Sequence, residues 1–224
     1  MTETRTESFQ LPDGRALQLT IAEPEQVVRG GLVVLHEARG VTETVRLLVS
    51  ALAAEGWLAV APHLYHGEPG TSQEDQVRHL SGESVLADTD IAFAFLADRG
   101  ITADLVGVVG FDLGGATAMV VAAERSIGAA VSVAACGIIQ PAAALPPLVE
   151  IAGELKCPWL GMYGDGDDAV DPAEVEKLRD AAIGSEVATD VVRFAGAGHR
   201  FDADPGAANE AWQRTLNWFD AHLR

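Results

Sequence analysis

Three residues that can carry acid–base or nucleophilic chemistry each stand in a Gly-rich segment. They are Asp112 in Gly-Phe-Asp-Leu-Gly-Gly, Asp167 in Gly-Asp-Gly-Asp and His199 in Gly-Ala-Gly-His. A carboxylate can act as a nucleophile or base, and a histidine oriented by a second carboxylate can activate water. In chain order the three residues would supply a nucleophile, an orienting acid and a base, so they are candidates for one catalytic triad.

Each candidate follows a short apolar run of the kind that forms strands buried on both faces of a parallel sheet. Such runs lie at Leu32–Leu35, Leu58–Ala61, Leu105–Val109, Ala129–Ala135, Trp159–Tyr163 and Val191–Phe194. Open α/β sheets carry their sites at the carboxyl ends of their strands. We therefore expect the three candidate side chains to meet at one edge of the sheet.

Helical patterns alternate with these strands. Single apolar helical faces are formed by Val45, Leu48 and Leu52 and by Trp212, Leu216, Phe219 and Leu223. Asp171 and Pro172 have the residue types of a helix start. This alternation predicts an α/β fold with one mostly parallel central sheet, helices on both faces, and a single domain over residues 1–224.

The segment around Asp112 matches a strand, a tight Gly-flanked turn and a helix, which is the pattern of the nucleophile elbow in α/β-hydrolases. A Gly-rich strand–helix turn of a Rossmann-like fold is the alternative reading of this motif alone. The chain lacks the spacing Gly-x-Gly-x-x-Gly here, and no Gly-Lys-Ser/Thr follows a strand, so nucleotide binding is disfavoured. The order nucleophile, acid, histidine favours the α/β-hydrolase fold.

Several segments resemble the dienelactone hydrolase family, from about residue 30 to the C-terminus. The matching segments are His36-Glu37-Ala38-Arg39-Gly40, residues 53–62 with the pair Leu64-Tyr65, residues 163–168 and residues 196–199. The resemblance implies a compact hydrolase that opens lactones or cleaves small esters without a cofactor.

The resemblance also implies roles for individual residues. His199 would be the base and Asp167 its orienting acid. The backbone N–H groups of Leu113 and Ala38 would form an oxyanion hole. Glu37 would be an auxiliary carboxylate that points at the nucleophile.

Asp112 departs from the family pattern, which has Cys or Ser at this position. A carboxylate that attacks an ester carbonyl forms a mixed anhydride, whereas attack at saturated carbon forms an ordinary ester, as in the opening of epoxides or displacement of halide. The sequence therefore leaves several functions open. These are hydrolysis of a lactone or ester, hydrolysis of an epoxide or halide, a nucleophile-substituted variant, and a non-catalytic relative that binds a small molecule.

The charges around Asp112 are a second open point. If Glu37 faces Asp112, one carboxylate must hold a proton unless a cation neutralises the pair. Arg39 and Arg200 are the candidate cations and candidate substrate-binding residues. Ala203 stands where the family's substrate-binding arginine is expected.

A few other side chains could also belong to the site. Tyr65 follows a central strand. Either its hydroxyl donates a hydrogen bond to a leaving oxygen, or its side chain only packs against neighbouring residues. His63, His66 and Glu68 have too loose a spacing for a metal site, so we expect loop histidines and no metal. Cys136 ends the strand after the elbow, which would place it near the site, and we expect it to pack as a small buried hydrophobic side chain.

The segment Gly137–Lys156, which follows the strand after the elbow, is short and contains three prolines. Relatives that use Asp nucleophiles carry a helical cap at this place. We therefore predict no large cap, a shallow site and a small substrate.

The charge balance excludes some partners. The chain has 15 Lys and Arg against 33 Asp and Glu, a net charge of −18. Such a surface repels phosphate backbones and anionic lipids, so no nucleic-acid or membrane partner is expected. A polar N-terminus and the lack of a bilayer-length apolar run predict a cytoplasmic protein. We expect a small-molecule substrate and a monomer or homodimer.

Overall fold

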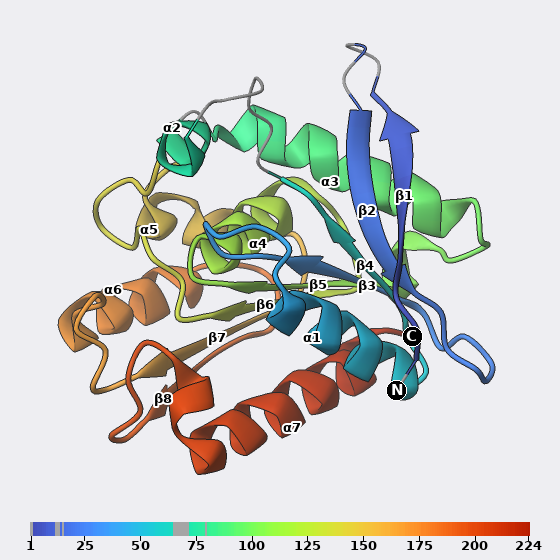
Figure 1. Cartoon of the computed structure of the whole chain (residues 1–224). Helices are drawn as coiled ribbons and strands as arrows, with labels where there is room; N and C mark the ends of the chain where they lie inside the picture. Colours follow the sequence, from blue (N-terminus) through green and yellow to red (C-terminus); the bar gives the residue numbers. More distant parts are fainter. Residues whose placement is uncertain (1, 12–13, 15, 65–71, 79) are drawn as a thin grey trace.

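The computed structural model of the chain describes residues 2–11, 14, 16–64, 72–78 and 80–224. Within these residues, eight strands form one sheet in the order β1-β2-β4-β3-β5-β6-β7-β8 (Figure 1). The strands are β1 (Arg5–Gln10), β2 (Ala16–Ala22), β3 (Gly31–Leu35), β4 (Leu58–Pro62), β5 (Val106–Phe111), β6 (Ala129–Val133), β7 (Trp159–Gly164) and β8 (Thr189–Phe194).

The strands from β3 to β8 are parallel, and all six predicted strands are confirmed. The boundaries differ from the predicted ones by one or two residues; β6, for example, ends at Val133 rather than at Ala135. Ala134 has a φ of 48°, a left-handed conformation that an extended strand does not contain. Two strands were not predicted: β1 and β2 pair antiparallel with each other, and β2 pairs antiparallel with β4.

Helices cover both faces of the sheet. They are α1 (Glu43–Ala54), α2 (Gln73–Arg78), α3 (Gly82–Ala97), α4 (Leu113–Glu124), α5 (Leu148–Ile151), α6 (Pro172–Ala182) and α7 (Pro205–His222). Helices α1 and α7 lie on one face of the sheet, and α3, α4, α5 and α6 lie on the other (Figure 1). Their buried side chains form a separate core on each face. This arrangement confirms the predicted α/β class with a mostly parallel sheet.

The predicted absence of a large cap is also confirmed. The whole chain between β6 and β7 is described, and its helical content is the four-residue α5 followed by a short 3₁₀ turn, Ala152–Glu154. Among the described residues, no helix combines the length and the apolar character that crossing a bilayer requires.

Helix α7 is capped at its start and packs against the sheet near its end. At its start, the carboxylate of Asp204 accepts a hydrogen bond from the Gly206 N–H at 2.9 Å. Near its end, the fully buried ring of Phe219 lies over Gly107 of β5, where a Cβ would come within 2.6 Å of the ring. The helix therefore has a defined distance from the sheet, which matters because it follows His199 directly.

Replacement of Phe219 by Ala should lower the free energy of unfolding by about 3 to 5 kcal/mol, because the truncation leaves a cavity between α7 and β5. Ile183→Ala, at a side chain that is 69% exposed, is the control and should cost less than about 0.5 kcal/mol. Urea unfolding followed by circular dichroism measures both values. Equal losses in the two variants would contradict this account of how α7 is held.

Candidate active site

Asp112 lies at the tip of a tight turn between β5 and α4. Its backbone has φ 52° and ψ −116°, a conformation that side-chain-bearing residues rarely adopt. Glycines on both sides make the turn possible. A Cβ on Gly110 would lie 1.9 Å from the Gly114 carbonyl oxygen, and one on Gly114 would lie 2.1 Å from the Leu35 carbonyl oxygen. The predicted elbow geometry is therefore present.

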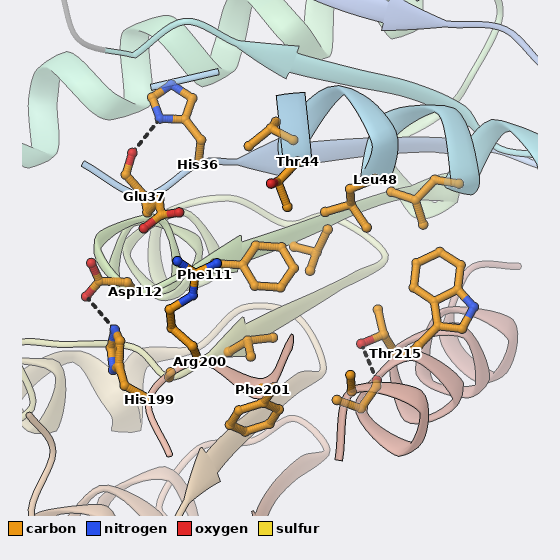
Figure 2. A pocket seen from close by; sticks show the side chains of 18 residues that line it. His36, Glu37, Thr44, Leu48, Phe111, Asp112, His199, Arg200, Phe201 and Thr215 are labelled. Atoms are coloured by element: carbon orange, nitrogen blue, oxygen red, sulfur yellow. Dashed lines mark hydrogen bonds and ion pairs between the residues drawn. The ribbon is translucent and has the colours of Figure 1, made fainter. Parts of the chain in front are cut away.

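The other two predicted residues meet Asp112 at the same edge of the sheet. Asp167 follows β7 and His199 follows β8. The His199 Nδ1–H donates to Asp167 Oδ2 at 2.8 Å, and Nε2 lies 3.7 Å from Asp112 Oδ1 (Figure 2). The predicted contact between His199 and Asp167, with the ring directed towards Asp112, is confirmed. The chemical roles of the three residues stay predictions.

The loop after β7 that carries Asp167 (the acid loop) packs closely against the loop after β8 that carries His199 (the histidine loop). The Gly166 N–H donates to the Ala197 carbonyl oxygen at 2.9 Å, and a Cβ on Gly164 would lie 2.2 Å from that same oxygen. The Asp167 side chain is fully buried, and its second oxygen accepts from the Ala169 N–H at 2.8 Å. Both oxygens of Asp167 are thus held, which fixes the direction of the His199 ring.

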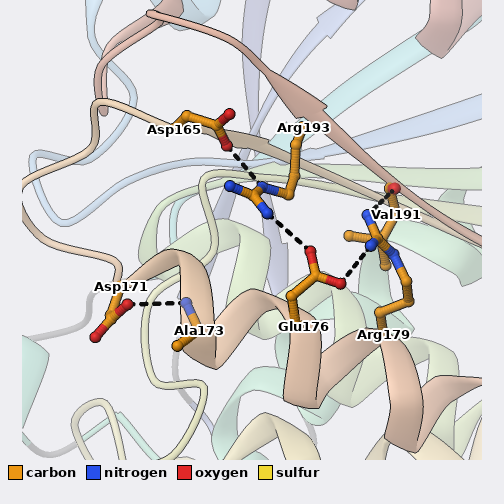
Figure 3. Close-up of polar contacts among 7 residues, drawn as sticks. All are labelled: Asp165, Asp171, Ala173, Glu176, Arg179, Val191 and Arg193. Atoms are coloured by element: carbon orange, nitrogen blue, oxygen red, sulfur yellow. Dashed lines mark hydrogen bonds and ion pairs between the residues drawn. The ribbon is translucent and has the colours of Figure 1, made fainter.

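A network of ion pairs ties the start of the acid loop to β8 and α6 (Figure 3). Arg193 on β8 donates to Asp165 at 2.6 Å and to Glu176 on α6 at 3.0 Å. Arg179 pairs with Glu176 and also donates to the Val191 carbonyl oxygen at 2.9 Å. These contacts are largely exposed, so they position the loop and add little to overall stability.

The loop after β3 is held by the buried His36 ring. The Leu64 N–H donates to His36 Nε2 at 3.1 Å, so Nε2 is the acceptor and Nδ1–H donates to the Glu37 carbonyl oxygen at 2.9 Å. Burial lowers the pKa of His36 to about 4. The loop abuts the first turn of α4, and the predicted oxyanion donors, the N–H groups of Ala38 and Leu113, belong to these two segments.

Glu37 lines the same cavity as Asp112, and its carboxylate accepts from the Arg39 guanidinium at 2.9 Å. Arg39 therefore offsets the charge of Glu37. Arg200 also lines the cavity, and Figure 2 shows its side chain between His199 and Phe111. A role of Arg39 or Arg200 in binding substrate stays a prediction.

Cys136 lies near the elbow, as expected. Burial, and after it the negative charge of Asp112, raise the pKa of the Cys136 thiol to about 12. A thiol that remains protonated at neutral pH is a poor nucleophile. The environment of Cys136 therefore disfavours a role for its thiol as a nucleophile.

Three residues weighed from the sequence, Tyr65, His66 and Glu68, lie outside the described residues. His63 is described, and its Nε2 forms a hydrogen bond with the Thr20 hydroxyl at 3.0 Å. In the described parts of the chain, His, Cys, Asp and Glu side chains form no group of three or more that could hold a metal ion.

A cavity of about 250 Å³ opens at Asp112 and His199 and continues inward between α1 and α7. Leu52 of α1 and Thr215 of α7 both line it. The prediction of a shallow site is therefore wrong. The cavity exists because α7 presents small residues to the sheet at Ala208, Ala211 and Thr215, a spacing that the sequence displays and that our sequence analysis missed.

Aromatic side chains of this cavity were missed as well. Phe111, Phe201 and Trp212 line it, yet from the sequence Trp212 was assigned only to the apolar face of the last helix. Figure 2 shows Phe111 and Phe201 between the Asp112 end and the end at Leu48 and Thr215. Phe111 stands one residue before Asp112, and Phe201 stands two residues after His199. These positions are the signal in the sequence that could have identified both as cavity residues.

Comparison with known proteins matches residues 17–223 to the family described as “Dienelactone hydrolase family”. A Salmonella typhimurium protein described as “Putative carboxymethylenebutenolidase” is 33% identical over 204 residues, which cover 84% of this chain and 76% of that protein. A Rhodococcus opacus protein described as “Carboxymethylenebutenolidase” is 28% identical over 208 residues, covering 86% of this chain and 81% of that protein.

Solved structures show the same fold. The crystal structure of a “Putative Dienelactone Hydrolase” from Klebsiella pneumoniae has a TM-score of 0.86 at 28% identity, covering 97% of this chain and 99% of that one. A puromycin-hydrolyzing peptidase from Mycobacterium tuberculosis has a TM-score of 0.83 at 19% identity, covering 99% of this chain and 39% of that one. The second likeness concerns the fold alone.

The environment of His36 makes stability depend on pH. Its pKa falls from 6.5 in the unfolded chain to about 4 in the folded one, so folding disfavours the proton. Neutral His36 therefore contributes to the free energy of unfolding above pH 6.5. This contribution, about 3 kcal/mol, is lost as the pH falls towards 4. His36→Gln should lack this part of the acid destabilisation in urea unfolding at pH 7 and pH 4.5.

A site-specific measurement complements the unfolding experiment. In an NMR titration, the imidazole signal that is missing from the His36→Gln spectrum should not titrate above about pH 5. A midpoint near the ordinary histidine value would show that the ring is not buried as described.

Proposed function

Because the chain belongs to the dienelactone hydrolase family, we propose that it hydrolyses a small lactone, ester or related electrophile through Asp112, His199 and Asp167. Asp112 takes the place of the family's Cys or Ser nucleophile. The observation that carries the proposal is its position, on the strained elbow and 3.7 Å from the Nε2 of a histidine that is itself bound to Asp167.

The chemistry of a carboxylate selects the bond that is attacked. Attack at a carbonyl carbon would give a mixed anhydride, which is more activated than the ester that it replaces. We therefore place the attack at the saturated carbon that bears the leaving group. An Asp112 oxygen bonds to this carbon, the bond to the leaving oxygen or halide breaks, and the electron pair departs with the leaving group. The intermediate is an ordinary ester of Asp112.

The second step releases the product. His199 Nε2 takes a proton from a water molecule, which attacks the carbonyl carbon of the Asp112 ester, and Asp167 stabilises the resulting imidazolium. The N–H groups of Leu113 and Ala38 are the proposed donors to the oxyanion of this step. In this step the bond between the ester oxygen and the Asp112 carbonyl carbon breaks, while the bond between that oxygen and the product carbon stays intact. The product leaves with the original Asp112 oxygen, and an oxygen from water takes its place in the Asp112 carboxylate.

Two neighbouring groups support this assignment. The Cys136 thiol, with its pKa raised to about 12, does not compete as nucleophile. The pairing of Glu37 with Arg39 offsets a negative charge in the cavity that would otherwise oppose a second carboxylate. Both observations favour Asp112 as the group that reacts.

A single turnover of styrene oxide in heavy-oxygen water should place the label in the Asp112 carboxylate, measured by mass spectrometry of the peptide. Asp112→Asn should lower turnover by about 10⁴-fold or more, because no other group can form the ester. Asp98→Asn, at an exposed position at the end of α3, is the matched control and should keep wild-type turnover.

The opposite results would separate the alternatives. An unlabelled Asp112, together with increased cleavage of 4-nitrophenyl acetate by Asp112→Cys, would identify the chain as a substituted Cys hydrolase and overturn the carboxylate mechanism. Binding of small electrophiles without turnover of epoxides, alkyl halides, lactones or esters would identify a binding module.

A further inference from the structure

The cavity between α1 and α7 has a charged end and an uncharged end. Figure 2 shows Glu37, Asp112, His199 and Arg200 at one end and Leu48 and Thr215 at the other. Among the other residues that line the cavity, Val45, Leu52, Val109 and Ala211 are uncharged, so Leu48 and Thr215 mark the uncharged end. We propose that this end binds an uncharged aromatic group of the substrate while the reacting carbon lies at Asp112. The inference rests on the proposed function, because it assigns the reacting carbon to that site.

The lining chemistry argues against a charged or strongly polar occupant. The Thr215 hydroxyl donates to the Ala211 carbonyl oxygen at 2.8 Å, so its hydrogen is used inside the helix. Leu52 is fully buried and offers only carbon. A carboxylate placed here would lose its hydration without gaining a partner, which is strongly unfavourable.

The size and the aromatic walls argue for a ring. A cavity of about 150 Å³ is enough to hold benzene, so the volume of about 250 Å³ accommodates one ring and a short link to the reacting carbon. Phe111, Phe201 and Trp212 supply aromatic surface on which a ring can pack edge to face or offset. A two-ring group would exceed this space without rearrangement.

The occupant reaches the reacting atoms directly. Phe111 lines the cavity and immediately precedes Asp112 in the chain, while Phe201 lies two residues after His199. A ring at the uncharged end therefore needs only a short link, passing these two aromatic side chains, to place the reacting carbon at Asp112. The favoured substrate class is a monocyclic aryl electrophile whose leaving group is one or two carbons from the ring.

Binding of inert diols to the wild-type protein tests this inference without requiring any reaction. In isothermal titration calorimetry, 1-phenyl-1,2-ethanediol should bind about thirtyfold more tightly than 1,2-propanediol, because the ring buries more apolar surface than a methyl group. A carboxylate at the 4-position of the ring should weaken the binding by about a hundredfold. Equal affinities for the phenyl and methyl diols would overturn the inference.

Two variants locate the ring. Ala211→Leu fills the uncharged end and should weaken the phenyl diol about tenfold, whereas Ala221→Leu, at an exposed position of the same helix, should leave its affinity unchanged. Leu52→Ala enlarges the cavity and should strengthen binding of 1-(2-naphthyl)-1,2-ethanediol about tenfold. Leu52→Ala decides the matter if thermal unfolding shows that Ala211→Leu does not fold.

The two proposals fail in different ways. If the phenyl diol binds as expected but heavy oxygen does not enter Asp112, the aromatic subsite stands and the carboxylate mechanism falls. If the label enters Asp112 but Ala211→Leu and Ala221→Leu bind the phenyl diol equally, the mechanism stands and the subsite is wrong.

Discussion

The close approach of three backbone segments at the elbow is the constraint on which the site depends. The turn at residues 110–114 folds back on itself, and the end of β3 passes over its last residue. Neither contact leaves room for a Cβ, so glycine is required at Gly110 and Gly114. The same contacts hold Asp112 in a conformation that costs energy, and they bring the Ala38 loop against the first turn of α4. A displacement of β3 would therefore disturb the nucleophile position and the loop beside it together.

Acidic side chains in this site are kept apart by separate partners. Glu37 is paired with Arg39 at the rim, Asp167 is buried with both oxygens hydrogen-bonded, and Asp112 faces the His199 ring. This division matters in a chain of net charge −18, where unpaired carboxylates at close range would repel one another. It also gives the two aspartates different surroundings, since 31% of the Asp112 side chain is exposed while the Asp167 side chain is fully buried.

The sequence predicted the parallel part of the sheet and the meeting of Asp112, Asp167 and His199, because buried parallel strands are continuous apolar runs whose carboxyl ends share an edge. The family resemblance, drawn from short motifs, is confirmed by the match over residues 17–223. The strands β1 and β2 were missed because neither is a continuous apolar run: β1 has a single apolar residue, Phe9, and β2 alternates apolar with polar residues. In β2 this alternation is visible at Leu17 and Leu19, and a search for period-two patterns would have found it.

The depth of the site was not predictable from the same patterns. It depends on how far α7 stands from the sheet, and this distance is set by the size of side chains that are distant in sequence, among them Phe219 over Gly107 and the small residues Ala211 and Thr215. The depth in turn bears on the chemistry. In the proposed mechanism, an apolar group that fills the cavity would exclude water from one side of Asp112, and a less hydrated carboxylate is a stronger nucleophile towards saturated carbon. If Asp112 acts as proposed, the packing of α7 links the choice of substrate to the reactivity of its carboxylate.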